Sequence, residues 1–522
     1  MYKLKKAFNF LNNNRVIVVF LLITLLGVAL RIATLLSKDI FTDEVFYTEV
    51  ARQKSFLSII QIDHWIKDHG QLYLIYLKIV QGLTTNIIFI RFSNIFLYLV
   101  LNFSLFKFFN KFQKGQISLF PVLLFSFLPF FVYLNSYISP YNFVLFFSIL
   151  SFIFISNFIL FSKTKKEKVI NSSLFLLFSA LAFYSDYSVV YFYLSLIPLV
   201  FLVFKWNEKQ AEDLVLIGFL NFILITPGLY ILFGNFQYFS ALNNDGSYIN
   251  HYLNNDLLVF LNNFTNIILF DLGKNVSLFI FAAFFILVCT ILFKSRKDRL
   301  TSFLSFVFLS GILINILFLY IFNNSYFSIL TERTFWYFYF LLVIGLSAIA
   351  VHFKRYKKTF VLILTFIILF IALKFFNSYK IDPISRQNFN YKGLVNNLLS
   401  DKNLQHKSLI VFFDEYNTFR YIPLREYYFK ALDNRGTKKS LTVRNYFANQ
   451  KIVVLENIKS INSAGIKNKE AVIFIVLDEN VKNYLKFKNS VNIYEETKKV
   501  KTINIFYRVS CKDSNCQFYL SK

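Results

Sequence analysis

Two adjacent carboxylates, Asp43 and Glu44, stand in the segment Phe41-Thr-Asp-Glu-Val-Phe-Tyr47, just after the first long apolar stretch of the chain. A paired carboxylate at a membrane surface is costly unless it meets a counter-charge, lies in a solvated cavity or takes part in function. A carboxylate beside a dry cavity can act as general base toward an incoming hydroxyl group. Asp43 could also simply cap a helix that begins at Glu44.

The same segment, residues 37–86, contains other polar side chains that could take part in catalysis or binding: Asp63, His64, Lys67, Asp68, His69, Tyr73 and Lys78. Farther along, Asp186 is a lone acid between two apolar stretches, and Arg333 precedes another. Simpler interpretations stay open. Lys78 could be a snorkelling lysine, Arg333 a headgroup anchor, His69 a solvated loop histidine and Asp186 a structural residue.

The composition identifies a membrane protein. Of 522 residues, 56% are hydrophobic and 20% are aromatic, more than a soluble protein can bury. The net charge of +27 does not indicate nucleic acid, because Lys and Arg fall in short runs between apolar stretches. With three cysteines and 14 glycines, no metal cluster or nucleotide cradle is expected, so we predict no cofactor and no metal site.

Eleven apolar segments predict eleven uninterrupted transmembrane helices, the first of them uncleaved. They lie near 16–36, 87–106, 117–134, 141–162, 169–184, 187–204, 212–234, 276–293, 301–322, 335–351 and 359–376. The basic clusters then all fall on the side of the N-terminus, which the positive-inside rule makes the cytoplasm. These clusters are Lys3/Lys5/Lys6, Lys107/Lys111/Lys114, Lys163–Lys168, Lys205/Lys209, Lys294–Arg299 and Lys354–Lys358.

The opposite, extracytoplasmic side receives the loop 37–86 and everything from 377. Within that loop, residues 70–83 have apolar side chains at helical spacing (Leu72, Ile75, Tyr76, Ile79, Val80 and Leu83), which predicts a short amphipathic helix at the membrane interface. Trp336 has the position of an interfacial belt aromatic.

Residues 377–522 form a second domain, outside the membrane module 1–376. Short apolar runs at 409–413, 452–455 and 471–477 predict buried strands, and the patterns at 391–399, 417–430 and 480–488 predict helices. The predicted fold is therefore a polytopic α-helical membrane protein with a C-terminal extracytoplasmic α/β domain. At its end, Cys511 and Cys516 flank a predicted four-residue hairpin loop and could form a disulfide.

In these motifs the chain resembles the polyprenyl-phosphate-sugar glycosyltransferases of the GT-C fold, in the branch with protein O-mannosyltransferases and the aminoarabinose transferase of lipid A. That family has an Asp-Glu pair with aromatics after its first helix, as in Phe41–Tyr47 here. Asp68-His69-Gly70-Gln71-Leu72-Tyr73 stands where the family has Asp-His-Pro-Pro-Leu-Tyr. Lys78, Arg91-Phe-Ser, Ser139-Pro140-Tyr141 and Arg333 complete the order of motifs.

The resemblance implies an enzyme that moves a sugar from a polyprenyl-phosphate carrier to an extracytoplasmic acceptor, with inversion at the anomeric carbon. It implies Asp43 as general base, with Glu44 orienting the acceptor or Asp43. Lys78 and Arg333 would hold the phosphate, and Asp68, His69, Tyr73 and Asp186 would line the site. The expected partners are the lipid-linked sugar, its acceptor and membrane lipid.

An envelope lipid or glycan transporter is the alternative, with Asp43, Asp186 and Arg333 as pathway charges. Transporters often have internal repeats and broken mid-membrane helices, and the sequence predicts neither. Turnover of a polyprenyl-phosphate sugar would indicate the enzyme, and flux without turnover the transporter.

Overall fold

The computed structural model describes residues 15–37, 44, 47–48, 51, 56, 71–84, 86–112, 116–234, 261, 274–295, 298–321, 336–353, 408–413, 453–455, 471–477, 503–512 and 515–520. The chain divides into two compact units. One comprises Met1–Leu36 and Val50–Asn377, and the other comprises Ser37–Glu49 and Ser378–Lys522.

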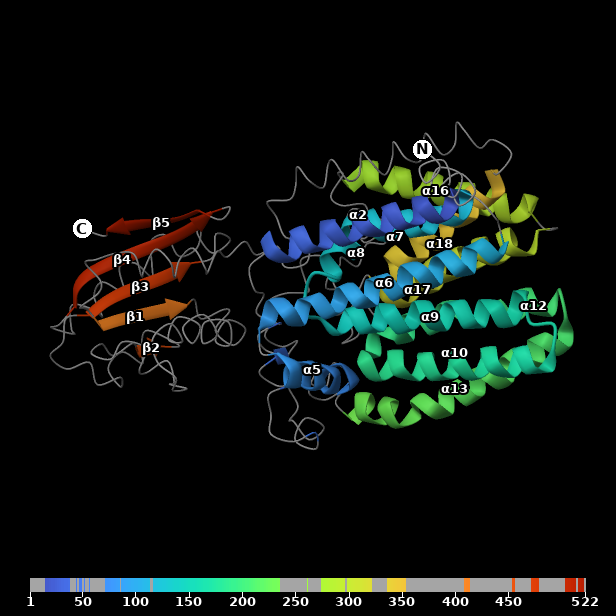
Figure 1. The fold of residues 1–522 in the computed structure, drawn as a ribbon, viewed down its shortest axis with the longest axis horizontal. Coiled ribbons are helices and arrows are strands. Elements are labelled where there is room, and N and C mark those ends of the chain that lie inside the picture. The colour runs from blue at the N-terminus through green and yellow to red at the C-terminus, as the bar shows by residue number, and fades with distance from the viewer. Residues whose placement is uncertain are drawn as a thin grey trace, which may run out of the picture. The chain divides into compact units, whose positions relative to one another are not determined.

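The first unit is a bundle of apolar helices (Figure 1). Among the described residues, eight helical stretches are long and apolar enough to cross a membrane, so the chain is a multi-pass membrane protein. Seven are single helices: α2 (Arg15–Ser37), α6 (Ile87–Phe112), α9 (Pro140–Leu160), α10 (Lys165–Ser185), α13 (Glu208–Gly234), α16 (Lys274–Lys294) and α17 (Arg299–Ile321). Two shorter apolar helical stretches are Ile117–Phe127 and α18 (Trp336–His352).

Two of the predicted spans are interrupted, contrary to the sequence-based expectation. The span predicted at 117–134 consists of η2 (Gln116–Leu119), α7 (Phe120–Phe127) and α8 (Pro129–Leu134). The span predicted at 187–204 consists of η3 (Tyr187–Val189), α11 (Val190–Leu196) and α12 (Leu199–Phe204). A proline follows each interruption, and proline both removes a backbone donor and crowds the preceding turn. The last predicted span, 359–376, lies outside the described residues.

The two interruptions differ in geometry. Leu128, which precedes Pro129, is extended, with φ −61° and ψ 125°, because a proline disfavours the helical region for the residue before it. Ile197 and Pro198 both keep helical dihedral angles. The first interruption is therefore a true break in the helix, whereas the second is a kink.

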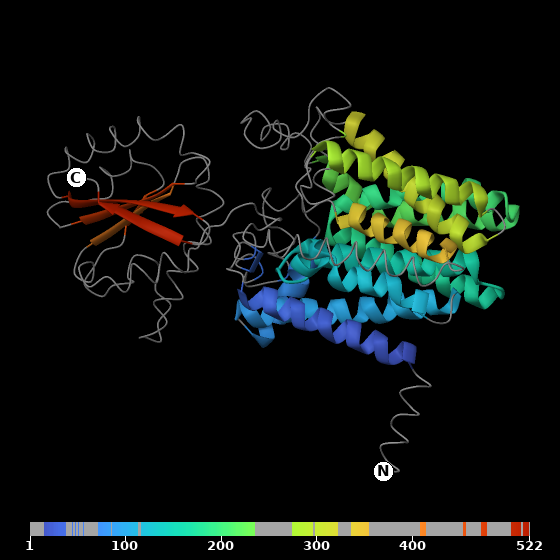
Figure 2. The same ribbon diagram turned by 90° about the horizontal axis from the view of Figure 1, so that it is seen from above.

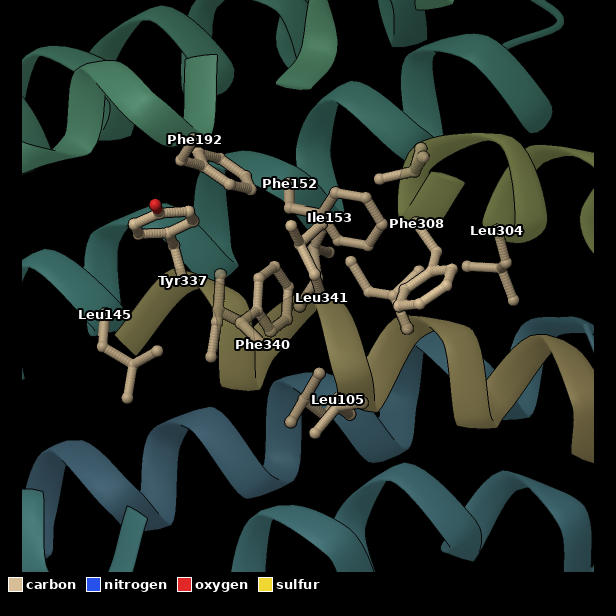
Figure 3. Close-up of a cluster of buried hydrophobic side chains, with 14 of the residues drawn as sticks. Leu105, Leu145, Phe152, Ile153, Phe192, Leu304, Phe308, Tyr337, Phe340 and Leu341 are labelled. Atoms are coloured by element: carbon tan, nitrogen blue, oxygen red, sulfur yellow. The ribbon is translucent and has the colours of Figure 1, made fainter. Parts of the chain in front are cut away.

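Aromatic and aliphatic side chains fill the centre of the bundle. Around α18, Phe340 meets Phe152 of α9 edge to face with ring centroids 5.4 Å apart, and Phe308 of α17 packs close by (Figure 3). Small residues allow the close contact of α17 with α18: a Cβ at Gly345 would lie 2.8 Å from the Phe308 ring. Many of the exposed large side chains of α2, α13 and α16 are aliphatic or aromatic, as expected for surfaces that face lipid.

The predicted helix at 70–83 is confirmed as α5 (Gln71–Leu83). The buried side chains are Tyr73, Leu74 and Leu77, whereas Ile79 and Leu83 are exposed. The reason is that α5 packs against α10 and the start of α9, so the side chains turned toward those helices are buried.

The second unit contains a five-stranded sheet in the order β2-β1-β3-β4-β5, whose strands are labelled in Figure 1 and seen from above in Figure 2. Its strands are β1 (Ser408–Phe413), β2 (Val453–Leu455), β3 (Ala471–Leu477), β4 (Ile503–Lys512) and β5 (Asn515–Leu520). The first four are parallel, and β5 is antiparallel to β4. β1, β2 and β3 coincide with the runs predicted as strands, while the helices predicted at 391–399, 417–430 and 480–488 lie outside the described residues.

Candidate functional site

The basic residues of several different helices lie at one end of the bundle. Lys111, at the end of α6, donates to Asn157 Oδ1 of α9 at 3.3 Å. Lys168, near the start of α10, forms an ion pair with Asp213 of α13 at 3.0 Å. Arg299, the first residue of α17, lies over the Trp206 ring. The described basic residues Lys111, Lys168 and Arg299 therefore share one end of the bundle, and Asp186, which follows the last residue of α10, lies toward the other.

At that other end, α5 presents two of the predicted site residues. Tyr73 is buried, and its ring meets Phe143 of α9 at a centroid distance of 5.5 Å. Lys78 is partly exposed, and its Nζ lies 5.6 Å from the centroid of the Phe56 ring, within cation–π range. Burial raises the pKa of Tyr76, which keeps this neighbouring phenol protonated at neutral pH.

Asp186 follows the last residue of α10, the helix on which α5 packs, and it is buried. Its Oδ1 accepts a hydrogen bond from the backbone N–H of Ser188 at 2.8 Å, which caps the short helix η3. The structural interpretation of Asp186 thus has a defined geometric basis.

Glu44 is buried with 1% of its surface exposed, and it belongs to the second unit through the segment Ser37–Glu49. The four remaining predicted site residues, Asp43, Asp68, His69 and Arg333, lie outside the described residues. The structure shows that α5, which carries Tyr73 and Lys78, packs on α10, the helix that Asp186 follows.

Sequence reasoning missed Arg31, the most deeply buried cation among the residues of the bundle that the structure describes. Its guanidinium is fully buried, donating from Nε to Asn135 Oδ1 at 3.0 Å and from Nη2 to the Phe125 carbonyl at 3.0 Å. Nη1 donates to the carbonyls of Ser126 at 2.9 Å and Gly27 at 3.1 Å. The charge is also 3.6 Å from the centroid of the Tyr98 ring.

The position of Arg31 follows from the break at Leu128. In a continuous helix the N–H of residue 129 would bond to the Phe125 carbonyl, and Pro129 has no N–H. Arg31 supplies the missing donor at the carboxyl end of α7, where a positive charge is also favoured by the helix dipole. The arginine in an otherwise apolar span, read together with Pro129, was the available sequence signal.

A chain of amides continues from Arg31 to the corner between α8 and α9. Asn135 Nδ2 donates to Asn142 Oδ1 at 2.9 Å, and Asn142 Nδ2 donates to the Tyr137 carbonyl at 2.8 Å. Asn94 of α6 donates to the same carbonyl at 2.6 Å. The corner is thereby fixed by buried hydrogen bonds that must all be made for the corner to be stable.

Two motifs that carried the resemblance have structural roles at this corner. Ser139 is the N-cap of α9, and Pro140 occupies its first turn, where a proline needs no donor. Arg91 is buried near the start of α6, where its Nη1 donates to the Leu35 carbonyl at 3.0 Å, and its guanidinium lies 5.4 Å from the Tyr137 ring centroid.

Trp336, expected at the interface, is instead fully buried at the start of α18, and its Nε1 donates to Ser188 Oγ at 3.2 Å.

Among the residues that the structure describes, no group of three or more His, Cys, Asp or Glu side chains could hold a metal ion. No protein-family model matches the chain, and no curated protein matches it.

Proposed function

We propose that the chain is a membrane glycosyltransferase that moves a sugar from a polyprenyl-phosphate carrier to an acceptor outside the cytoplasm. The acid pair Asp43-Glu44, directly after the first span, is the feature on which the proposal depends most. The fold that goes with it has eleven spans of the GT-C type. The eight long helical stretches, the α7–α8 segment and α18 would be ten of them, and residues 359–376 the eleventh.

In the proposed reaction, a hydroxyl oxygen of the acceptor attacks the anomeric carbon and inverts its configuration. Asp43 takes the hydroxyl proton, and Glu44 orients Asp43 or the acceptor. The bond from the anomeric carbon to the phosphate oxygen breaks, and the phosphate leaves with the electron pair. Lys78 and Arg333 stabilise the phosphate with charge-assisted hydrogen bonds.

Support comes from the chemistry collected at one end of the bundle. The helix α5 carries Lys78 and the buried Tyr73, and it packs on α10, which the buried Asp186 follows. The basic clusters lie at the opposite end, and by the positive-inside rule that end is cytoplasmic. Under this orientation the candidate site faces outward, away from nucleotide donors, which suits a lipid-linked sugar as the donor.

The alternative, a lipid or glycan transporter, gains one observation from the broken helix α7–α8, because broken helices are common in transporters. In transporters, the carbonyls freed by such a break often coordinate a transported cation. Here Arg31 occupies the carbonyls of Phe125 and Ser126. A side chain of the protein therefore satisfies the carbonyls at the break, which leaves them unavailable to a transported cation. This favours the enzyme over the transporter.

Purified protein in lipid vesicles separates the two functions. Polyprenyl-phosphate sugars of several kinds are added with envelope glycan extracts as acceptors, and release of the polyprenyl phosphate is measured by mass spectrometry. Release that depends on protein and acceptor supports the transferase. Movement of the intact lipid-linked sugar across the vesicle, without its cleavage, would indicate the transporter.

A further inference from the structure

The last two strands of the chain form a hairpin at one edge of the sheet. Lys512 of β4 pairs with Asn515 of β5, so only two residues separate the strands, not the four predicted from the sequence. The strand order places β5 beyond β4, and of the described strands it pairs with β4 alone. An edge strand held from one side is the least supported part of a sheet.

The register of this hairpin sets two cysteines directly opposite each other. Cys511 of β4 pairs with Cys516 of β5, one step from the closing pair Lys512 and Asn515. Opposed residues of antiparallel strands have Cα atoms about 4.5–5.5 Å apart. A disulfide tolerates Cα separations of about 4.4–6.8 Å, so the spacing of this pair lies within the range that the bond requires.

We propose that Cys511 and Cys516 form a disulfide that ties the edge strand β5 to β4. One thiolate attacks the disulfide of an extracytoplasmic thiol–disulfide oxidoreductase, and the second thiolate displaces that enzyme from the mixed disulfide. Two protons leave the cysteines, and two electrons reduce the oxidoreductase to its dithiol form. This inference rests on the extracytoplasmic placement of the sheet and is independent of the proposed reaction.

The bond closes a very small loop, so it constrains the unfolded chain only slightly. Its effect is local, since it fastens β5 in register and leaves the strands β1 to β3 unchanged. Loss of the bond should therefore leave the membrane module intact. The third cysteine, Cys289 of α16, carries a free thiol and serves as an internal reference.

The sequence of the hairpin allows a direct test. N-ethylmaleimide is added to intact cells and to the denatured lysate, so that oxidation after lysis is excluded, and the full-length protein is digested with trypsin without reduction. Trypsin cuts after Arg508 and after Lys512, between the two cysteines. The proposal predicts that residues 509–512 and 513–522 are recovered as one linked species, two hydrogens lighter than the separate peptides together.

Two variants serve as controls. Cys511→Ser should abolish the linked species and leave Cys516 modified by the maleimide, whereas Cys289→Ser should leave the linked species unchanged. Recovery of both hairpin peptides carrying maleimide in the wild-type protein would overturn the proposal. A link from either hairpin cysteine to Cys289 would overturn it as well.

Discussion

The Nη2 group of Arg31 donates to the backbone carbonyl of Phe125, which is the carbonyl that Pro129 leaves without its helical donor. A side chain from the first span thus completes the hydrogen bonding of a helix broken within the bundle. Unsatisfied backbone groups are especially costly in a membrane, since no water replaces the lost bond. The arginine and the break are therefore two parts of one structural unit.

Replacing Arg31 by Met should destabilise the bundle strongly. The change leaves the carbonyls of Phe125 and Ser126 without donors, and each buried unsatisfied group costs about 1–3 kcal/mol. The melting temperature in detergent is the measurement, and Arg15→Met, at the exposed start of α2, is the matched control. Equal melting temperatures of the two variants would contradict this account of Arg31.

The coupling between Arg31 and Pro129 can be measured separately. Pro129→Ala restores an N–H that can reach the Phe125 carbonyl, so it should reduce the loss caused by Arg31→Met. We expect the double variant to melt above the Arg31→Met single variant. Strictly additive effects would show that the proline and the arginine act independently.

Two glycines provide a matched test of helix packing. A Cβ at Gly345 would lie 2.8 Å from the Phe308 ring and 3.1 Å from the Phe284 ring, whereas a Cβ at Gly218 would meet nothing within 4 Å. Gly345→Ala should therefore destabilise the bundle by about 1–3 kcal/mol through overpacking and lower its melting temperature. Gly218→Ala should be neutral or stabilising, because alanine favours a helix over glycine by about 1 kcal/mol. The reverse order of the two variants would contradict the packing of α17 on α18.

The orientation of the bundle can be tested by cysteine labelling. In a background without native cysteines, Lys294→Cys should react with an impermeant maleimide only after the inner face of the membrane is exposed. Ser400→Cys should react in intact cells. The opposite pattern would place the candidate site on the cytoplasmic side and remove the basis for a lipid-linked donor.

Hydropathy and charge pattern predicted most of the spans, because each span must bury its own backbone polar groups and carry an apolar surface. The same reasoning failed where the outcome depends on partners from distant parts of the chain. Arg31 is acceptable in a span only because Pro129 frees a carbonyl about a hundred positions later. Neither residue alone indicates the break that unites them.

Which side chains of α5 are buried likewise depends on contacts with distant parts of the chain. Its apolar residues surround much of the helix, so the period of the pattern left the buried side ambiguous. Contact with α9 and α10 decides that Tyr73 and Leu77 are buried and that Ile79 is exposed. For the site, the sequence predicts the residue types and their order along the chain, and these stay predictions.

Removal of the proposed phosphate-binding cations should weaken use of the donor. Loss of one side of a buried charged contact costs about 2–5 kcal/mol, which corresponds to roughly 30- to 5,000-fold in kcat/KM. We expect losses in this range for Lys78→Ala and Arg333→Ala, and a smaller loss for Lys78→Arg. Lys107→Ala, at the exposed basic end of α6, is the control. Donor turnover like that of wild type in both alanine variants would make the two cations interfacial anchors.

The most direct test of the central claim is the turnover of a polyprenyl-phosphate sugar by Asp43→Asn protein in lipid vesicles. Asparagine keeps the shape of the side chain and any capping hydrogen bond but cannot accept the hydroxyl proton. We predict that the variant folds, binds the donor as wild type does and releases no polyprenyl phosphate in the presence of acceptor. Turnover near the wild-type rate would leave Asp43 as a helix cap and would contradict its assignment as the general base.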